Sequence, residues 1–141
     1  MKHTFFLILI AALVVVPQIS GQGNSVVRYP FLVHGDLPVY PALAKTARIT
    51  GTVQIRVTVE NGEVVGTVTI SGHPLFVDAA TDNIKSWKFD KTVRTTFVTT
   101  FIYQLDGKSE ETNEPSNPKL DLELPSLAKI TARPPYNQTL Y

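Results

Sequence analysis

The sequence predicts an α+β fold in which a β-hairpin, one main helix and a third strand follow one another along the chain. Residues 51–60 alternate apolar with polar side chains, the period of a half-buried strand, and Asn61-Gly62 then favours a two-residue hairpin turn. Apolar residues recur at helical spacing after Pro74. Residues 95–105 are rich in β-branched and aromatic side chains, as strands prefer.

The two-residue turn also sets the pairing of the first two strands. The expected register pairs Val59 with Val64, Val57 with Gly66, Ile55 with Val68 and Val53 with Ile70. One face of this hairpin would then consist of apolar residues and glycine, so the turn and the alternation agree.

The main helix is predicted to begin at Pro74, because a proline at the first helical position loses no hydrogen bond. Its apolar stripe consists of Phe76, Ala79, Ala80, Ile84 and Trp87. We expect Trp87 to hold the helix on the hairpin's apolar face and to bury roughly 150–250 Å². A short helix is predicted after Pro41, where Leu43, Ala44 and Ala47 form a weaker stripe.

The third strand, Thr95–Leu105, follows the helix, which returns the chain to the far end of the hairpin. It would therefore run antiparallel to the first strand, giving a three-stranded sheet of order 2-1-3 with the helix across one face. In this arrangement Thr95–Leu105 is an edge strand.

The remaining segments flank this predicted domain, residues 38–107. Residues 24–37 form a lead-in, and residues 108–118 are polar with two prolines, which indicates a loop. In the tail, residues 108–141, Leu120, Leu122 and Leu124 alternate with acids. This alternation predicts an extra C-terminal strand within residues 119–131, able to cap the sheet.

Residues 1–23 have the layout of a secretory signal peptide. After Lys2, Phe5–Val16 is an apolar run of 12 residues, and small residues follow at Ser20, Gly21 and Gly23. A membrane-spanning helix needs about 20 residues, so export to the periplasm is the favoured interpretation. The alternative is an uncleaved inner-membrane anchor facing the periplasm, the one case in which membrane contact is expected.

The composition argues against catalysis and against nucleic-acid binding. The 141-residue chain has no cysteine and a formal net charge of +1, so it offers no thiolate nucleophile and no basic footprint. Metalloprotease, hydrolase-elbow and phosphate-loop motifs are missing. His73 and Asp78 could share a metal, but a histidine before Pro74 is better explained as part of a helix start. No enzyme activity, cofactor or metal is therefore expected.

Several short motifs in order resemble the C-terminal domain of the TonB family, the energy transducers of Gram-negative envelopes. They are Tyr40-Pro41, Gly51-x-Val53, Asn61-Gly62-x-Val64, Ser71-Gly72-His73-Pro74-Leu75, Ala79-Ala80 and Trp87-Lys88-Phe89. The resemblance covers about residues 37–105. It implies that Tyr40, Pro41, Gly51, Asn61, Gly62, Pro74, Trp87 and Phe89 are structural residues of the fold.

The resemblance also implies a function in envelope transport. In the family the third strand accepts a short peptide of outer-membrane transporters by strand addition. Carried over to this sequence, the peptide-binding residues are Thr96, Phe97, Val98, Thr99, Thr100, Phe101, Ile102 and Tyr103. The lead-in reaches no more than about 50 Å when extended, unlike the long spacer of classical members, so we do not expect energy transduction.

Three outcomes remain open for the edge formed by Thr95–Leu105. It can bind a peptide of an outer-membrane transporter or another envelope protein. It can instead be capped by the chain's own tail through Leu120–Leu124, as edge strands commonly are, which would suit an accessory or structural envelope protein. It can also pair with a second copy in a homodimer.

Overall fold

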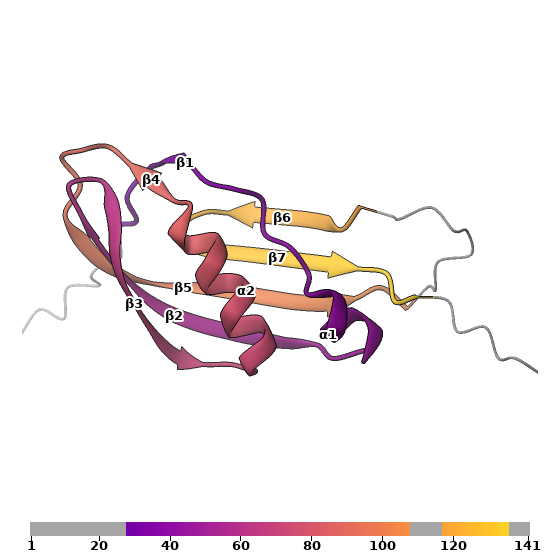
Figure 1. Cartoon of the computed structure of the whole chain (residues 1–141). Helices are drawn as coiled ribbons and strands as arrows, with labels where there is room; N and C mark the ends of the chain where they lie inside the picture. The colour runs from indigo at the N-terminus through magenta and orange to yellow at the C-terminus, as the bar shows by residue number, and fades with distance from the viewer. Residues whose placement is uncertain (1–27, 108–116, 136–141) are drawn as a thin grey trace, which may run out of the picture.

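The computed structural model describes residues 28–107 and 117–135 (Figure 1). The expectations for the signal peptide or anchor, for the first residues of the lead-in and for most of the polar loop therefore lie outside the described residues.

Two helices and seven strands make up the described part of the chain. In chain order they are β1 (Leu32–His34), α1 (Ala42–Thr46), β2 (Gly51–Glu60), β3 (Glu63–Ser71), α2 (Pro74–Lys85), β4 (Lys88–Phe89), β5 (Thr95–Leu105), β6 (Lys119–Glu123) and β7 (Leu127–Ala132). The predicted hairpin, main helix and third strand correspond to β2, β3, α2 and β5.

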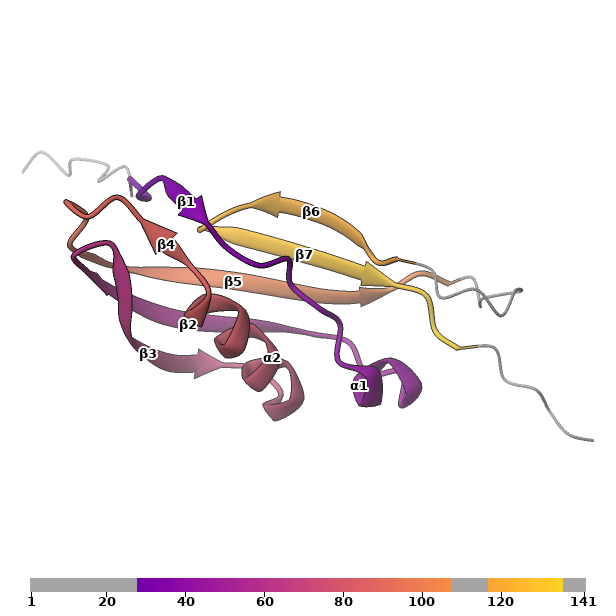
Figure 2. The ribbon, with the colours of Figure 1, turned by 45° about the horizontal axis from the view of Figure 1, so that its top comes forward.

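All seven strands belong to one mixed sheet of order β1-β4-β3-β2-β5-β7-β6. α2 lies across one face of this sheet, and α1 lies near the end at which β5 and β7 finish (Figures 1 and 2). The α+β class is confirmed. β3, β2 and β5 have the predicted order in the middle, but the expected three-stranded sheet is wrong in extent, because two more strands extend each side.

β5 is consequently not an edge strand, and that prediction is wrong. It pairs antiparallel with β2 on one side and parallel with β7 on the other. The tail does fold back, but through β7, whereas Leu120–Leu124 was expected to pair with β5. The physical reason is that β7 offers a fully apolar inner face at Ala128, Ile130 and Ala132, and this face continues the inner face of β5.

The pairing of β2 with β3 follows the predicted register only beside the turn. The observed partners include Glu60–Glu63, Val59–Val64, Thr58–Gly66, Arg56–Val68 and Gln54–Ser71. Val65 and Ile70 are extra residues in two irregularities of β3, which are β-bulges. A one-residue shift turns the following side chains to the opposite face, so Val68 is 58% exposed instead of facing the core.

The core lies between α2 and the inner face of the sheet. Its fully buried members include Val53, Ile55, Val57, Val59, Phe76, Ile84, Trp87, Phe101 and Ile130. Trp87 follows the end of α2 and stacks on Phe101 with ring centroids 6.1 Å apart. The tryptophan therefore links the end of the helix to β5.

Candidate protein-interaction site

The candidate site is β5, whose side chains alternate between the two faces of the sheet. Phe97, Thr99, Phe101 and Tyr103 are buried on the face covered by α2. The residues between them, Thr96 to Ile102 in steps of two, are exposed or half-buried on the open face. Strand addition uses backbone groups, so a partner that adds a strand must pair with one of the two backbone flanks of β5.

The flank of β5 that faces away from β2 is only partly covered by β7. Pairing with β7 begins at Thr100 and continues to Leu105. Thr100 N donates to Ser126 O at 3.0 Å, and Asp106 N donates to Ala132 O at 2.8 Å, so even-numbered residues direct their backbone groups to this flank. Because the direction of the backbone N–H and C=O groups alternates along a strand, those of Thr96 and Val98 also point to this flank. No strand within residues 28–107 or 117–135 lies beside these two residues there.

The uncovered part of this flank carries one side chain from the lead-in. The Tyr29 hydroxyl donates to Val98 O at 3.1 Å. The Tyr29 ring also contacts Phe97 edge-on, with centroids 5.7 Å apart. Of the predicted peptide-binding residues, 100–103 therefore lie beside β7, and 96–99 lie beyond its end, where Tyr29 contacts Phe97 and Val98.

β7 is held in place by more than backbone pairing. Ala128 and Ile130 are fully buried and Ala132 is nearly so. Burying one isoleucine side chain stabilises a fold by about 1.5–3 kcal/mol. Removing β7 would therefore expose part of the core as well as break a ladder of six residue pairs.

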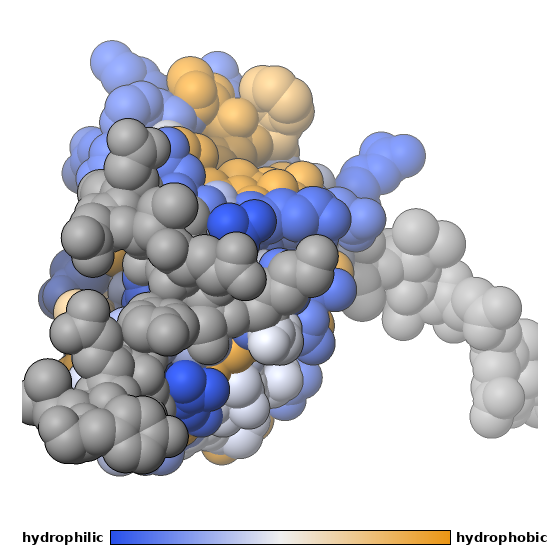
Figure 3. All heavy atoms as spheres, turned by 90° about the vertical axis from the view of Figure 1, so that its right-hand side faces the viewer, coloured by the Kyte–Doolittle hydropathy of each residue, from blue (hydrophilic) through white to orange (hydrophobic). Residues whose placement is uncertain are grey.

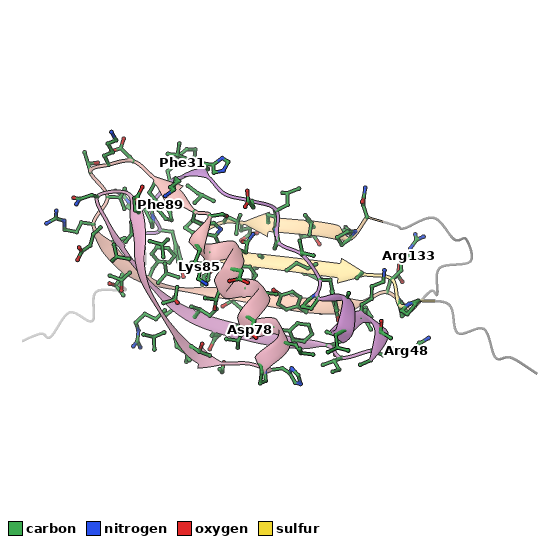
Figure 4. All side chains as sticks on the ribbon, in the orientation of Figure 1. Phe31, Arg48, Asp78, Lys85, Phe89 and Arg133 are labelled. Atoms are coloured by element: carbon green, nitrogen blue, oxygen red, sulfur yellow. The ribbon has the colours of Figure 1, made fainter. Side chains whose placement is uncertain are left out.

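The two terminal strands of the sheet differ in their surfaces. β6 carries Lys119, Asp121 and Glu123 on its outward face, and charges of this kind discourage further pairing. At the opposite end, beside β1, Phe31 is 84% and Val33 63% exposed. Hydrophobic residues gather at the top of the molecule in Figure 3, where Figure 1 places β1 and β4 and Figure 4 labels Phe31 and Phe89.

The hairpin motif has a clear structural role. Asn61 and Gly62 both have positive φ, at 51° and 77°. Gly62 N donates to Val93 O at 3.1 Å and Phe89 N donates to Gly62 O at 2.8 Å, so the turn also anchors the chain after α2. A Cβ on Gly62 would lie 2.5 Å from Phe89 O, which excludes other residues without a backbone shift.

A buried amide links the lead-in to the end of α2. Asn83 Oδ1 accepts from Trp87 Nε1 at 3.2 Å, and Asn83 Nδ2 donates to Asp36 O at 2.8 Å. Ser86 Oγ accepts from Asp36 N at 2.8 Å. Gly35 lies against the indole, because a Cβ there would come within 2.8 Å of Trp87 Cδ1. Asn83 and Tyr29 were not predicted as site-forming, and their long-range contacts have no local signal in the sequence. A capping strand was predicted within residues 119–131, but not that β7 is the part of it that pairs with β5.

Tyr40, Phe76 and Tyr103 form an aromatic cluster near the far end of β5. The rings of Phe76 and Tyr103 stack at 4.3 Å, and the Tyr40 hydroxyl donates to Ile49 O. The Tyr103 hydroxyl is buried without a hydrogen-bond partner among the described residues. Burial, with a smaller contribution from the charge of ionised Tyr40, raises the pKa of Tyr103 well above its ordinary value. These groups serve packing, since a buried neutral phenol cannot release its proton near neutral pH.

A metal-binding arrangement is not found in the described part of the chain. No group of three histidines or acids there could hold a metal ion. His73 is the N-cap of α2, where its Nδ1 accepts from Leu75 N at 3.3 Å. This geometry agrees with the interpretation of His73 as part of the helix start.

The described residues form an α+β domain in which one main helix covers a mixed sheet, and some strand flanks have no described strand beside them. The family model of the Gram-negative bacterial TonB protein C-terminal matches residues 36–106, half of the 141-residue chain. The chain therefore belongs to the TonB C-terminal family, which comprises non-enzymatic protein-interaction domains of the Gram-negative envelope. No curated protein matches the chain significantly. Within the described residues, neither helix is long and apolar enough to cross a membrane.

Proposed function

We propose that this chain is a TonB-like module of the periplasm that accepts an extended segment of an envelope partner, such as an outer-membrane transporter, as an added strand on β5. The observation that supports this most directly is β7, which already pairs with Thr100–Leu105 as an added strand on this flank. The flank is therefore geometrically able to take a strand, and the family membership supplies the kind of partner.

A partner peptide would have to compete with the chain's own tail. At Thr96 and Val98 it needs only to displace the Tyr29 side chain, which is 36% exposed. Each backbone hydrogen bond contributes about 0.5–1.5 kcal/mol, so this short stretch alone supports only weak binding. Stronger binding requires displacement of β7 from Thr100–Tyr103. In this proposal β7 lowers the apparent affinity for the partner.

A reversible disulfide between β5 and β7 tests the proposal. Gln104 and Thr131 are register partners across β5 and β7, and the chain has no natural cysteine. In a Gln104→Cys/Thr131→Cys variant of residues 24–141, oxidation forms a disulfide that holds β7 beside β5, and reduction breaks this disulfide. A TonB-box-like peptide is titrated into both states while the amide NMR signals of residues 96–103 are followed.

The reduced protein should show shifts along residues 96–103, and the oxidised protein should lose those at residues 100–103. The matched control is Gln54→Cys/Ser71→Cys, which locks β2 to β3 and should leave binding unchanged. Absence of any shift in the reduced protein would contradict peptide binding on β5. Equal binding in both states would place the peptide on another strand.

A second candidate function is favoured by the burial of Ala128 and Ile130. If β7 is a permanent core strand, the chain is an accessory or structural envelope protein with no peptide ligand and no energy transduction. Deleting residues 117–141 separates the two functions. A folded truncated domain, judged by circular dichroism, with new or stronger peptide binding supports the removable cap. Loss of folding supports the permanent strand.

The proposed compartment depends on residues 1–23. We propose that they direct export and are removed, which the N-terminal sequence of the mature protein tests. A mature protein that begins at Met1 and fractionates with the inner membrane would show the alternative, an uncleaved anchor.

A further inference from the structure

β3 has a long flank that no described strand covers. Its neighbour β4 pairs with it at a single position, Glu63 with Lys88, where the two side chains also form an ion pair at 3.0 Å. From Val64 to Ser71 this flank has no strand beside it in the described part of the chain. β3 runs along the lower left border of the coloured ribbon in both ribbon views (Figures 1 and 2).

The uncovered stretch lacks the charged residues and prolines that often protect an edge strand, although it does carry the two β-bulges. Residues 64–71 contain no charged residue and no proline, and they are mostly β-branched. Val65 is 57%, Val68 58% and Ile70 46% exposed. Natural edges are commonly blunted with lysine, proline or inward charges, whereas uncharged β-branched edges attract further strands. The two bulges limit a regular ladder to Gly66–Thr69.

We propose that the β3 flank pairs antiparallel with β3 of a second copy of this chain. A two-fold contact sets the same surface against itself, and an uncharged strand can do this without like-charge repulsion. On β6, by contrast, the charges of Lys119, Asp121 and Glu123 oppose further pairing. The absence of charge therefore favours self-pairing on the β3 flank over self-pairing on β6.

The geometry also selects the register. Residues directly opposite each other must point to the same face of a sheet. The two-fold axis must therefore pass midway between one residue and the same residue of the second copy. An axis at Val68 sets Val68 against Val68 of the second copy and Thr67 against its Thr69. An axis at Thr67 would instead set Val68 against glycine. Pairs of β-branched residues stabilise sheets better, so Val68 lies on the axis.

The contact is small, and the dimer is correspondingly weak. Stable protein interfaces bury about 1,200–2,000 Å², and one short strand pair with a few half-exposed side chains falls below this range. The dimer should form only at high local concentration. It would place the two β5 strands on opposite sides of the dimer contact, so two copies could engage two segments of a partner at once. The inference itself does not depend on peptide binding by β5.

A charge-swap pair tests the inference. Sedimentation velocity is measured over a wide concentration range for wild-type residues 24–141, for Val68→Lys and for Val68→Glu. We expect reversible dimerisation of the wild type and about tenfold or greater weakening in each single variant, because like charges meet on the axis. An equimolar mixture of the two variants should regain association as a heterodimer. Val39→Lys, at a position 68% exposed and outside the sheet, is the matched control and should dimerise like the wild type.

Each outcome bears on the proposal. A wild type that stays monomeric at all concentrations overturns it. Dimerisation that Val68→Lys leaves intact also overturns it, because the contact would then lie elsewhere. If circular dichroism shows that Val68→Lys does not fold, Thr67→Lys and Thr69→Lys replace it, because both positions lie within the Gly66–Thr69 ladder, and failure of both variants to weaken the dimer also overturns the proposal. Amide signals of residues 65–70 should broaden with concentration in the wild type only.

Discussion

β3 and β5 both pair antiparallel with β2, yet neighbouring strands cover their outer flanks to different extents. The outer flank of β5 pairs with β7 over Thr100–Leu105 and is contacted by Tyr29 at Val98, whereas the outer flank of β3 has no described strand beside it after Glu63. Both strands are rich in β-branched residues, so their own sequences do not decide the difference. It is decided by segments distant in the chain, and a strand's local pattern therefore cannot tell whether its flank is open.

The two flanks also differ in how firmly the neighbouring strand is held. β7 contributes buried side chains to the core, and β4 meets β3 at one residue pair. In β3 the bulges at Val65 and Ile70 turn Val68 outward, so this strand contributes less to the core than β5 does. The four predictions below test this asymmetry, beginning with the largest expected effect.

The first prediction compares one residue from each flank. Ile130→Ala, at a fully buried position of β7, should lower the free energy of unfolding by about 2–5 kcal/mol, the usual range for a truncated core isoleucine. Val68→Ala, on exposed β3, should change it by no more than about 0.5 kcal/mol. Urea unfolding of the two variants measures both values. Similar values for the two variants would contradict the asymmetry and would mean that β7 is loosely attached.

The second prediction concerns the turn that anchors β4 beside β3. Gly62→Ala should destabilise the fold by at least about 1–2 kcal/mol, because a side chain is disfavoured at φ 77°. The added Cβ would also lie 2.5 Å from Phe89 O, so the chain leading into β4 must shift. Gly107→Ala, where nothing lies within 4 Å of an added Cβ, is the control. Thermal unfolding, with NMR shifts at Lys88 and Phe89, would reveal both parts of the effect.

The contrast between the flanks marks how far the sequence alone could predict this fold. The alternation of β2, the Asn61-Gly62 turn and Pro74 are local signals, and they predicted the central strands, the main helix and the family. The bulge at Val65 is a one-residue irregularity that needs no special residue, so the register beyond it was wrong. The pairing of β7 with β5 depends on the closure of a loop, and alternation in the tail predicts a strand but not its neighbour.

The same limit applies to the candidate site. Thr96–Tyr103 does form part of a strand, as its composition predicted, and its inner residues are buried in alternation. Its coverage by Ser126, Ile130 and Tyr29 comes from both ends of the chain. No local pattern distinguishes Tyr29 from any other exposed tyrosine, so the sequence could predict the strand but not its accessibility.

The third prediction concerns the buried hydroxyl on the inner face of β5, opposite Ile130. Because this hydroxyl has no hydrogen-bond partner in the described structure, Tyr103→Phe should raise the free energy of unfolding by about 1 kcal/mol or leave it unchanged. The folded-state pKa of Tyr103 lies above the ordinary value of 10.0. Ionisation of Tyr103 therefore leaves the free energy of unfolding unchanged below about pH 10. It lowers the free energy of unfolding as the pH rises from there through the folded-state pKa.

Unfolding by urea as a function of pH checks this prediction. Wild-type stability should fall above about pH 10, because the unfolded chain releases the proton first, and Tyr103→Phe should flatten that fall. Tyr29→Phe serves as the control, since the Tyr29 hydroxyl is bonded near the surface. An equally steep fall in Tyr103→Phe would show that other groups cause the alkaline loss.

The smallest expected effect comes from the side chain that covers the open part of the β5 flank. Tyr29→Phe removes the hydrogen bond to Val98 O but keeps the ring that contacts Phe97. It should cost no more than about 0.5–1.5 kcal/mol of unfolding free energy. Hydrogen exchange at Thr96 and Val98 should quicken, and binding of a TonB-box-like peptide at residues 96–98 should strengthen, since a competitor is gone. Tyr29→Ala also removes the ring, so a gain seen only in that variant would mean that the ring, and not the hydrogen bond, shields this part of β5.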